Sequence, residues 1–412
     1  MLKTLNVLLI LIFSSVSLLC TKDFSALAPD SPVRPLSQGE QKIVKASGEF
    51  GFNLFKEIQK TQQKENIFIS PLSVSMALGM TLNGAANETE RAMQNTLGFD
   101  GLSDEEINQS YQSLIKLLAD LDPKVRFQIA NSIWYRLGFT VEQPFLDVNK
   151  TYFNAEVNAL DFNSPEAVAT INSWVDSKTN GKIKKILDQI DPMAVMFLIN
   201  AIYFKGTWTY EFDKKYTEDE PFYVGDTTQV TCKMMKQSND FLYYQNEEFQ
   251  AIDLPYGNGA FRMTVFLPAP GNSVDALIAQ LNAQNWAEWM GKFSKQKGTF
   301  YLPKFKLKYE KVLNQVLSTL GMGIAFGGGA DFTKINKNGG LYISKVLHKS
   351  FVDVYEEGTE AAAVTIVEIR MTSVGGESQG FFMRVDRPFL FAIREQNSRT
   401  ILFMGKIMNP AL

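Results

Sequence analysis

The sequence predicts an α+β fold in a single large domain. Helical patterns dominate the first half of the chain and strand patterns the second half, whereas a doubly wound α/β fold would alternate them. No long linker, internal repeat or low-complexity run divides residues 41–412. The content of 45% hydrophobic and 21% charged residues is that of a packed globular protein and excludes a disordered or fibrous chain.

The first twenty residues have the layout of an export signal. Lys3 gives a positive start, residues 7–13 are almost wholly apolar, and the small residues Ser15 and Ser17 follow. The segment is too short and too lightly flanked for a membrane-spanning helix. We therefore interpret residues 1–20 as a signal segment and expect the protein to be exported.

Two endings of this signal stay open. Ordinary cleavage after Ser17 would release a secreted protein. Alternatively, residues 17–20 resemble the bacterial lipoprotein signal, in which Cys20 would carry a lipid anchor, although Leu19 stands where that signal prefers a small residue. Residues 21–40, which contain three prolines, are interpreted as a flexible tether that suits either secretion or anchoring at the cell envelope.

Two amphipathic helices are expected early in the body. One is marked by apolar residues at helical spacing, namely Ile43, Phe50, Leu54 and Ile58. The other begins at a capping box formed by Ser103 and Glu106. Its apolar face continues through Ile107, Tyr111, Leu114, Ile115 and Leu118.

Strand patterns follow. Residues 125–129 alternate apolar and polar side chains, which predicts a half-buried strand. Residues 194–204 are nearly all apolar, which predicts a strand covered on both faces. From Phe222 short β segments dominate, with helices expected near Val274–Trp289 and Tyr309–Leu320. Residues 388–393 and 400–407 are expected to form two buried strands joined by a polar turn.

Two scarce residue types exclude several kinds of chemistry. His348 is the single histidine, so a zinc site built on several histidines is excluded and any Ser–His catalysis must use this residue. Cys20 and Cys232 are the two cysteines, so a disulfide framework is excluded; Cys232 is interpreted as a small buried hydrophobe. The formal charge of -3 gives no indication of a nucleic-acid partner.

Known catalytic and phosphate-binding motifs are missing from the sequence. It contains no Gly-x-Ser-x-Gly elbow, no Walker loop and no complete Gly-x-Gly-x-x-Gly. The glycines at 327–329 lack the strand-turn-helix context of a phosphate site and are interpreted as a turn. We therefore expect a protein that is not an enzyme and that uses neither a cofactor nor a metal.

Residues 356–373 do not follow an ordinary core or loop pattern. Their odd-numbered positions from Thr359 to Met371 are uncharged, and every charge after Gly358 lies at an even-numbered position. This period of two is typical of a strand with one buried face. A segment rich in glycine and polar residues follows at 373–380 and is expected to be solvated. The sequence thus encodes a potential strand attached to a loop.

This segment resembles the reactive-centre hinge of the serpins, the loop-inserting protease inhibitors. Further segments resemble serpin motifs in the family's order, and the likeness extends from about residue 41 to residue 410. These segments are Asn66–Ser73 (NIFISPLS), Asn200–Trp208 (NAIYFKGTW), Leu302–Phe305 (LPKF), Arg387–Phe391 (RPFLF) and Phe403–Lys406 (FMGK).

The resemblance implies a fold and a mechanism. In the family, a large central sheet opens between its two middle strands and smaller sheets accompany it. A protease attacks an exposed loop, here about residues 358–380, and forms an acyl-enzyme. The cleaved loop then inserts into the sheet as a new strand and traps the protease. The resemblance therefore implies a monomeric suicide-substrate inhibitor that forms a covalent complex with extracellular serine proteases. The alternative is a non-inhibitory serpin that acts as carrier or chaperone.

The resemblance also implies roles for particular residues. The hinge would comprise Glu356, Glu357, Gly358, Thr359, Glu360, Ala361, Ala362, Ala363, Val364 and Thr365. The shutter, a polar cluster beneath the opening strands, would comprise Ser70, Ser73, Asn200 and His348. Trp208, Lys304 and Glu356 would form the breach, where the loop meets the sheet.

Counting along the hinge locates the bond that the protease cuts. In the family it usually follows the seventeenth residue from the first hinge glutamate, which gives Thr372–Ser373 here. A small β-branched residue at Thr372 suits elastase-like proteases. A trypsin-like protease would find a secondary bond at Arg370–Met371.

Overall fold

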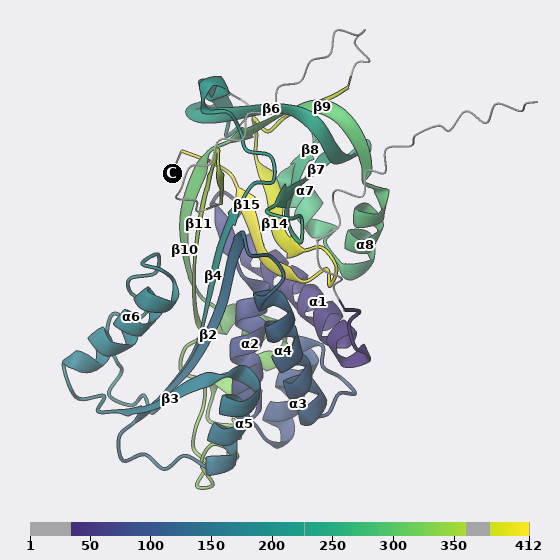
Figure 1. The fold of residues 1–412 in the computed structure, drawn as a ribbon. Coiled ribbons are helices and arrows are strands. Elements are labelled where there is room, and N and C mark those ends of the chain that lie inside the picture. Colours follow the sequence, from purple (N-terminus) through teal and green to yellow (C-terminus); the bar gives the residue numbers. More distant parts are fainter. Residues whose placement is uncertain (1–33, 226, 360–379, 412) are drawn as a thin grey trace, which may run out of the picture.

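The computed structural model describes residues 34–225, 227–359 and 380–411. Within these residues the helices and strands form two sheets flanked by helices. Figure 1 shows helices α1 to α5 on one side of the larger strands and α6 on the other. This arrangement confirms the predicted α+β class.

The first five helices lie together on one side of the central sheet. Helix α1 buries Ile43, Phe50, Leu54 and Ile58, as the helical spacing predicts. Helix α4 begins at the predicted capping box, in which the backbone N–H of Glu106 donates to the Ser103 hydroxyl over 3.2 Å. The bounds are α1 (Gln38–Thr61), α2 (Pro71–Leu82), α3 (Asn87–Leu97), α4 (Asp104–Ala119) and α5 (Gln143–Phe153).

The expected tether ends earlier than the sequence suggested. Helix α1 starts at Gln38, and Ser37 caps it through a hydrogen bond from the N–H of Glu40. The Glu40 side chain is fully buried and pairs with Arg34. Because this capping box and ion pair hold the chain to the body, the described residues 34–40 belong to the folded domain.

The central sheet has the strand order β10-β11-β12-β4-β2-β3. Only β2 and β3 run parallel to each other; the other neighbouring pairs are antiparallel. The bounds are β2 (Val125–Arg136), β3 (Ala155–Leu160), β4 (Met196–Thr207), β10 (Phe305–Val312), β11 (Leu347–Tyr355) and β12 (Gly358–Thr359).

Strand β4 differs from the expected strand at 194–204 in place and burial. It runs from Met196 to Thr207; its first three residues are half-buried, and buried and half-buried residues are mixed along the rest. Ile199 and Ala201 lie buried in a cluster with Trp174 of α6 (Glu166–Lys178). On its other edge, β4 pairs within the described chain only with β12, through Gly206 and Thr207. The rest of that edge has no described strand beside it, which accounts for the incomplete burial.

The expected helix at Tyr309–Leu320 is wrong in its first part. Strand β10 continues to Val312, and Tyr309 pairs with Ser350 of β11. The cause is a period-2 pattern in which Phe305 and Tyr309 are buried while the lysines between them are exposed. Short helical turns follow: α9 (Asn314–Leu317), η2 (Ser318–Met322) and η3 (Gly323–Phe326).

The helical region near Val274–Trp289 consists of two short helices, each with its own N-cap. Ser273 caps α7 (Val274–Ala279), and Asn282 caps α8 (Ala283–Lys292). The cap at Asn282 accounts for the break, because its side chain accepts the N–H of Asn285 and starts a new helix.

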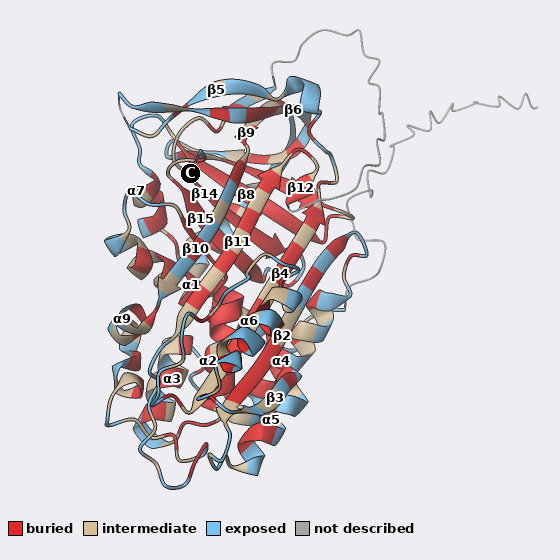
Figure 2. Cartoon of the chain, turned by 90° about the vertical axis from the view of Figure 1, so that its left-hand side faces the viewer, coloured by how far each residue is buried: buried red, intermediate tan, exposed pale blue. Residues whose placement is uncertain are grey.

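The second sheet has the order β1-β15-β14-β8-β7-β6-β9-β13, with β5 paired to β6. Its two C-terminal strands pair antiparallel and are buried, as predicted. Figure 2 shows the continuous burial of these strands. The bounds are β1 (Ile67–Ile69), β5 (Glu218–Tyr223), β6 (Gln229–Gln245), β7 (Phe249–Tyr256), β8 (Phe261–Pro268), β9 (Ser294–Pro303), β13 (Phe381–Arg384), β14 (Phe389–Glu395) and β15 (Ile401–Ile407), with η1 (Lys214–Tyr216) before β5.

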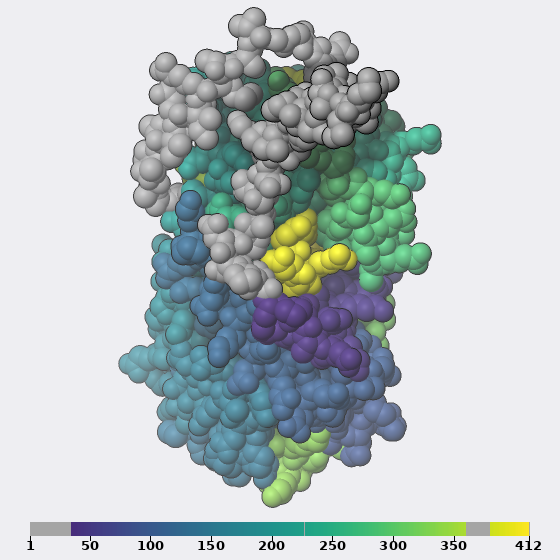
Figure 3. All heavy atoms as spheres, turned by 45° about the vertical axis from the view of Figure 1, so that its right-hand side comes forward, coloured from purple at the N-terminus to yellow at the C-terminus, as the bar shows by residue number. Residues whose placement is uncertain are grey.

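The beginning and the end of the described chain lie against each other. The Lys406 ammonium donates to the carbonyl oxygens of Gln62 and Gln63 over 2.9 and 2.8 Å. Asn66 donates to the carbonyl of Asn409 over 2.7 Å. Figure 3 shows the N-terminal helix beside a surface patch of the C-terminal segment. The segment that follows α1 is therefore tied to β15 of the second sheet and to the end of the chain.

Candidate functional site: the junction between β11 and β4

Strand β12 is inserted between two long strands of the central sheet. Gly358 pairs with Tyr355 of β11 and with Thr207 of β4, and Thr359 pairs with Val354 and Gly206. Figure 2 shows this short strand at one end of the opening between its neighbours. The loop was expected to begin at Gly358, but Gly358 and Thr359 lie in the sheet because both of their neighbours offer backbone partners.

Gly358 occupies a position that only glycine fits. Its φ of 154° lies in the region that L-residues rarely adopt. A Cβ atom built there would lie 2.1 Å from the carbonyl oxygen of Gly206 and 2.9 Å from the Cα of Thr207. Both the backbone angle and the close approach of β4 therefore require a residue without a side chain.

Thr359 points into the protein. It is 3% exposed, and its hydroxyl lies 2.6 Å from the hydroxyl of Tyr256. Tyr256 is fully buried, and burial raises the pKa of its phenol, which stays neutral. Tyr256 also stacks on Trp208 with ring centroids 4.3 Å apart. The sequence did not indicate a role for Tyr256, because its contact with Thr359 joins residues that are far apart in the chain.

The buried Glu356 forms an ion pair with the partly exposed Lys304 just before β12. Its side chain is 4% exposed; one carboxylate oxygen accepts the Lys304 ammonium over 2.7 Å and the other accepts the Thr217 hydroxyl over 2.9 Å. Burial by itself raises the pKa of this carboxyl, but the hydrogen bond and charge of Lys304, a hydrogen bond from the residue's own backbone and the hydrogen bond from Thr217 together lower it below its ordinary value. The sequence had identified Lys304 and Glu356, but not Thr217.

Trp208 joins the same cluster from the end of β4. Its indole N–H donates to the carbonyl of Tyr355 over 3.0 Å, and its backbone N–H donates to the carbonyl of Glu357 over 2.9 Å. The Glu357 carboxylate in turn pairs with Lys214. The three predicted breach residues thus meet at one place and fix the segment that leads into β12.

The histidine lies at the far end of β11 with two of the predicted serines. His348 is 6% exposed, and burial lowers its pKa to about 4. Its Nε2 accepts the backbone N–H of Ser70 over 3.2 Å. The Ser70 hydroxyl donates to the carbonyl of Leu402 over 2.7 Å and accepts the N–H of Ser73. Because Nε2 acts as acceptor, the neutral ring carries its proton on Nδ1.

This geometry is structural rather than catalytic. In Ser–His catalysis the imidazole accepts the proton of the serine hydroxyl. Here the imidazole accepts a backbone N–H, and the hydroxyl of Ser70 is directed to a carbonyl oxygen instead. The cluster therefore ties α2 to β11 and β15.

Asn200 does not join this cluster through any described hydrogen bond. Its amide donates to the side chain of Asn131 over 2.7 Å, and Asn131 donates to the carbonyl of Phe153 over 2.7 Å. The structure therefore places the four predicted shutter residues in two groups on opposite sides of the opening, one on β11 and α2 and the other on β4 and β2. No motif or pattern in the sequence indicated Asn131.

Several predicted residues lie outside the described residues. They are Cys20, the hinge residues Glu360, Ala361, Ala362, Ala363, Val364 and Thr365, and the residues of the two candidate bonds, Arg370, Met371, Thr372 and Ser373. Cys232 is described and buried, and burial raises its pKa to about 11, so it is a protonated thiol at neutral pH.

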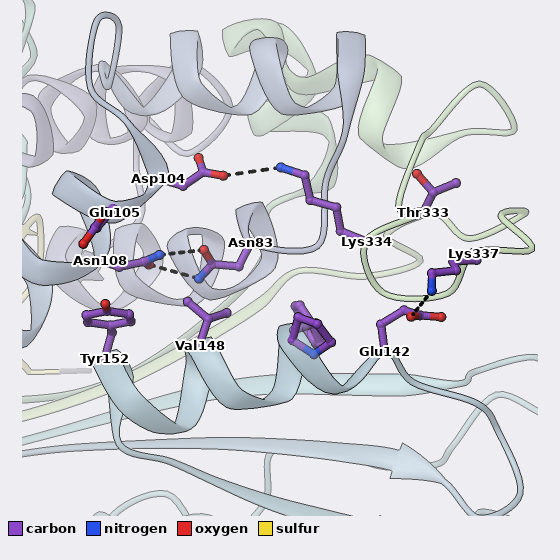
Figure 4. Close-up of a pocket in the computed structure, with 12 residues that line it drawn as sticks. Asn83, Asp104, Glu105, Asn108, Glu142, Val148, Tyr152, Thr333, Lys334 and Lys337 are labelled. Atoms are coloured by element: carbon purple, nitrogen blue, oxygen red, sulfur yellow. Dashed lines mark hydrogen bonds and ion pairs between the residues drawn. The ribbon is translucent and has the colours of Figure 1, made fainter.

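A hollow lies away from the junction, between α4, α5 and residues 333–337 (Figure 4). At its floor Asn83 and Asn108 exchange amide hydrogen bonds over 3.0 and 2.8 Å. Asn108 and Asn149 both stand in Asn-x-Ser/Thr sequences and are buried. Their amide groups are therefore structural and closed to glycosylation in the folded protein.

Comparison with known proteins identifies the class. The protein-family model described as serpin (serine protease inhibitor) matches residues 45–410. The chain is 34% identical to neuroserpin of Homo sapiens over 378 residues, which are 89% of this chain and 91% of that protein. The chain belongs to the serpin family.

Solved structures agree with this assignment. The thermophilic serpin tengpin in its native state has 34% identity and a TM-score of 0.82, with 92% of this chain and 96% of tengpin covered. Human thyroxine-binding globulin complexed with thyroxine has 30% identity and a TM-score of 0.82, with 90% and 99% covered. The fold is therefore the serpin fold, as the motifs predicted.

Proposed function

We propose that this serpin is a suicide-substrate inhibitor of extracellular serine proteases. The observation that carries the proposal is β12, in which the hinge residues Gly358 and Thr359 pair with a strand on each edge. A chain that continues from Thr359 in the same direction would run between β11 and β4. Cleavage of the loop would free it to do so.

The length of the segment fits this proposal. Residues 359–372 would extend about 46 Å at ~3.3 Å per residue. About a dozen new ladder hydrogen bonds at ~0.5–1.5 kcal/mol each could release on the order of 10 kcal/mol. Such a release is large enough to displace and distort an attached protease.

The composition of the hinge favours an inhibitor over a non-inhibitory carrier protein. Thr359, Ala361, Ala363 and Thr365 match the small, uncharged residues that inhibitory members direct into the sheet. The competing function is that of a non-inhibitory carrier, which the likeness to thyroxine-binding globulin keeps as the second candidate. A carrier would present the same fold without forming an acyl complex.

The target is inferred from the candidate bond. Thr372 precedes it and suits an elastase-like protease with a shallow apolar pocket. Arg370 offers a trypsin-like protease a secondary bond, which shortens the inserting segment by two residues and so weakens the trap.

A denaturing gel tests the proposal. The protein is incubated with an elastase-like protease, a trypsin-like protease and each protease after its active-site serine has been blocked. A detergent-stable complex of protease and serpin that appears only with active protease is expected. Simple cleavage without such a complex would contradict inhibition and favour the carrier.

We further propose that the protein is exported and is anchored by a lipid at Cys20. Replacement Cys20→Ala should then release it from membranes into the soluble fraction, which cell fractionation measures. A mature chain that starts at Leu18, found by mass spectrometry, would contradict lipidation and indicate plain secretion.

A further inference from the structure

A lysine-rich hollow lies on the outer face of the central sheet. It has a volume of about 530 Å³ and lies between residues 181–185, which follow α6, and the strands β10 and β11. Its six lysines come from three separate parts of the chain: Lys182, Lys184, Lys185, Lys306, Lys308 and Lys349. Because these parts are far apart in sequence, the sequence alone did not indicate the cluster.

The strand lysines share one face because of the ladder between β10 and β11. Lys308 stands opposite Phe351, and Lys349 stands opposite Glu310. The ring of Phe351 lies beneath two ammonium groups, with the nitrogens of Lys182 and Lys306 at 5.2 and 5.7 Å from its centroid. The aromatic ring and the strand pairing thus hold positive charges on both walls of the hollow.

The charges of the hollow are only partly balanced. Lys185 pairs with Asp188 over 2.7 Å, Lys306 with Asp353 over 3.1 Å, and Lys349 with Glu310 over 2.8 Å. The Lys349 side chain is only 14% exposed.

Two of the six lysines lack such a partner. Lys184 and Lys308, on opposite walls, have no ion pair with any described carboxylate. A concave site with this excess of positive charge attracts anions.

We propose that this hollow binds a compact anion that carries several phosphate or sulfate groups. Lysine ammonium groups bind such groups as point charges through charge-assisted hydrogen bonds. Lys184 and Lys308 would contact the anion from opposite walls. The anion would thereby link the segment after α6 to the face of the sheet.

This link has a consequence that rests on the proposed function. Insertion of the loop requires β11 and β4 to part, and the segment after α6 lies against β11. A bound anion that fixes this segment to β10 and β11 would slow insertion. More inhibitor would then be cleaved as substrate for each protease trapped.

Calorimetric titration of the full chain with tripolyphosphate at about 0.1 M salt, and separately with a sulfated tetrasaccharide, tests the site. The parent is expected to bind at least one of them at one site, and the tighter of the two identifies the source of the anion. The double variant Lys184→Gln, Lys308→Gln should bind at least roughly tenfold more weakly. Absence of binding to both probes would overturn the proposal.

A matched control separates the hollow from general charge. The double variant Lys45→Gln, Lys292→Gln removes the same charge from exposed positions outside the hollow. Its affinity should stay within about twofold of the parent. Equal losses in the two double variants would also overturn the site.

The stoichiometry of inhibition provides the second measurement. Saturating tripolyphosphate should raise it in the parent and leave it unchanged in Lys184→Gln, Lys308→Gln. Calorimetric binding without this rise would overturn the effect on insertion, whereas failure of the parent to form any acyl complex would overturn the proposed function instead.

Discussion

Gly358 sets the place where the hinge enters the sheet. The close approach of Gly206 leaves no room for a Cβ atom, and the backbone angle is one that other residues avoid. The two neighbouring strands can therefore pair with β12 only while position 358 carries no side chain.

The free energy of unfolding of the variant Gly358→Ala should be lower than that of the parent by at least ~1–3 kcal/mol. Both the strained backbone and the clash with the carbonyl of Gly206 contribute to this loss. Urea unfolding measures this. The control is Gly48→Ala, which replaces an unobstructed glycine inside α1 and should stabilise by about 0.5–1 kcal/mol. Equal stability of Gly358→Ala and the parent would contradict the geometry of β12.

His348 makes the stability of the shutter depend on pH. Its folded pKa of about 4 lies below the ordinary value of 6.5, so the unfolded chain binds the proton first as the pH falls. The stabilisation from the neutral ring is therefore complete above about pH 6.5 and is lost between there and about pH 4. Protonation would also set an N–H against the N–H of Ser70.

The parent should lose roughly 1.4 kcal/mol of unfolding free energy between pH 7.5 and pH 5.5 through this group. Since the chain contains one histidine, the variant His348→Gln should lose far less over this interval. Urea unfolding at the two pH values measures both. Parallel losses in parent and variant would show that the ring is not held neutral by burial.

At the scale of the element, β12 is a two-residue strand that would lengthen if the following residues entered the sheet. Thr359 already points inward against Tyr256, and in a strand that continued from it, alternation would direct the following side chain to the opposite face. The first uncharged odd-numbered position of residues 356–373, Thr359, is thus an inward-facing one.

The variant Thr359→Arg should convert the inhibitor into a substrate. The protease would still acylate the loop, but an unpaired charge at the buried position 359 costs several kcal/mol, which would displace β12 from the sheet and slow insertion of the residues that follow. The number of inhibitor molecules consumed per protease should rise several-fold. The control Glu360→Arg should change this number little, and a larger effect of Glu360→Arg would contradict the inward orientation of Thr359.

Local periodicity predicted some elements well and others poorly. The spacing in α1, the capping box of α4 and the alternation in β2 are properties of adjacent residues, so the sequence showed them directly. The end of β10, residues 309–312, was mistaken for the start of a helix because apolar residues at 309, 313 and 317 also fit a helical spacing, and only the pairing with β11 decides between them.

For the site, too, the sequence indicated some residues and not others. Motif resemblance pointed to Lys304, Glu356, Trp208, Ser70 and His348, which the structure places around the opening. Tyr256, Thr217 and Asn131 contact these residues from distant parts of the chain and were missed. The separation of Asn200 from His348 follows from their strands lying on opposite sides of β12, which only the sheet order reveals.

At the scale of the whole molecule, β11 and β4 are joined, within the described residues, through the two residues of β12 at one end of the central sheet. Two residues of β12 hold its neighbours together at one end, with the ion pair of Glu356 and Lys304 beside them. At the other end, His348 on β11 and Asn200 on β4 bond to different partners. The sheet therefore has separate anchors on the two sides of its opening.

The central claim is that the intact protein stores free energy that loop insertion releases. The melting temperature of the intact protein, compared with that of the protein cleaved near Thr372 by an elastase-like protease, tests it most directly. A gain on the order of 10 kcal/mol in a domain of this size should raise the melting temperature by roughly 10 °C or more. An unchanged or lower melting temperature after cleavage would contradict loop insertion.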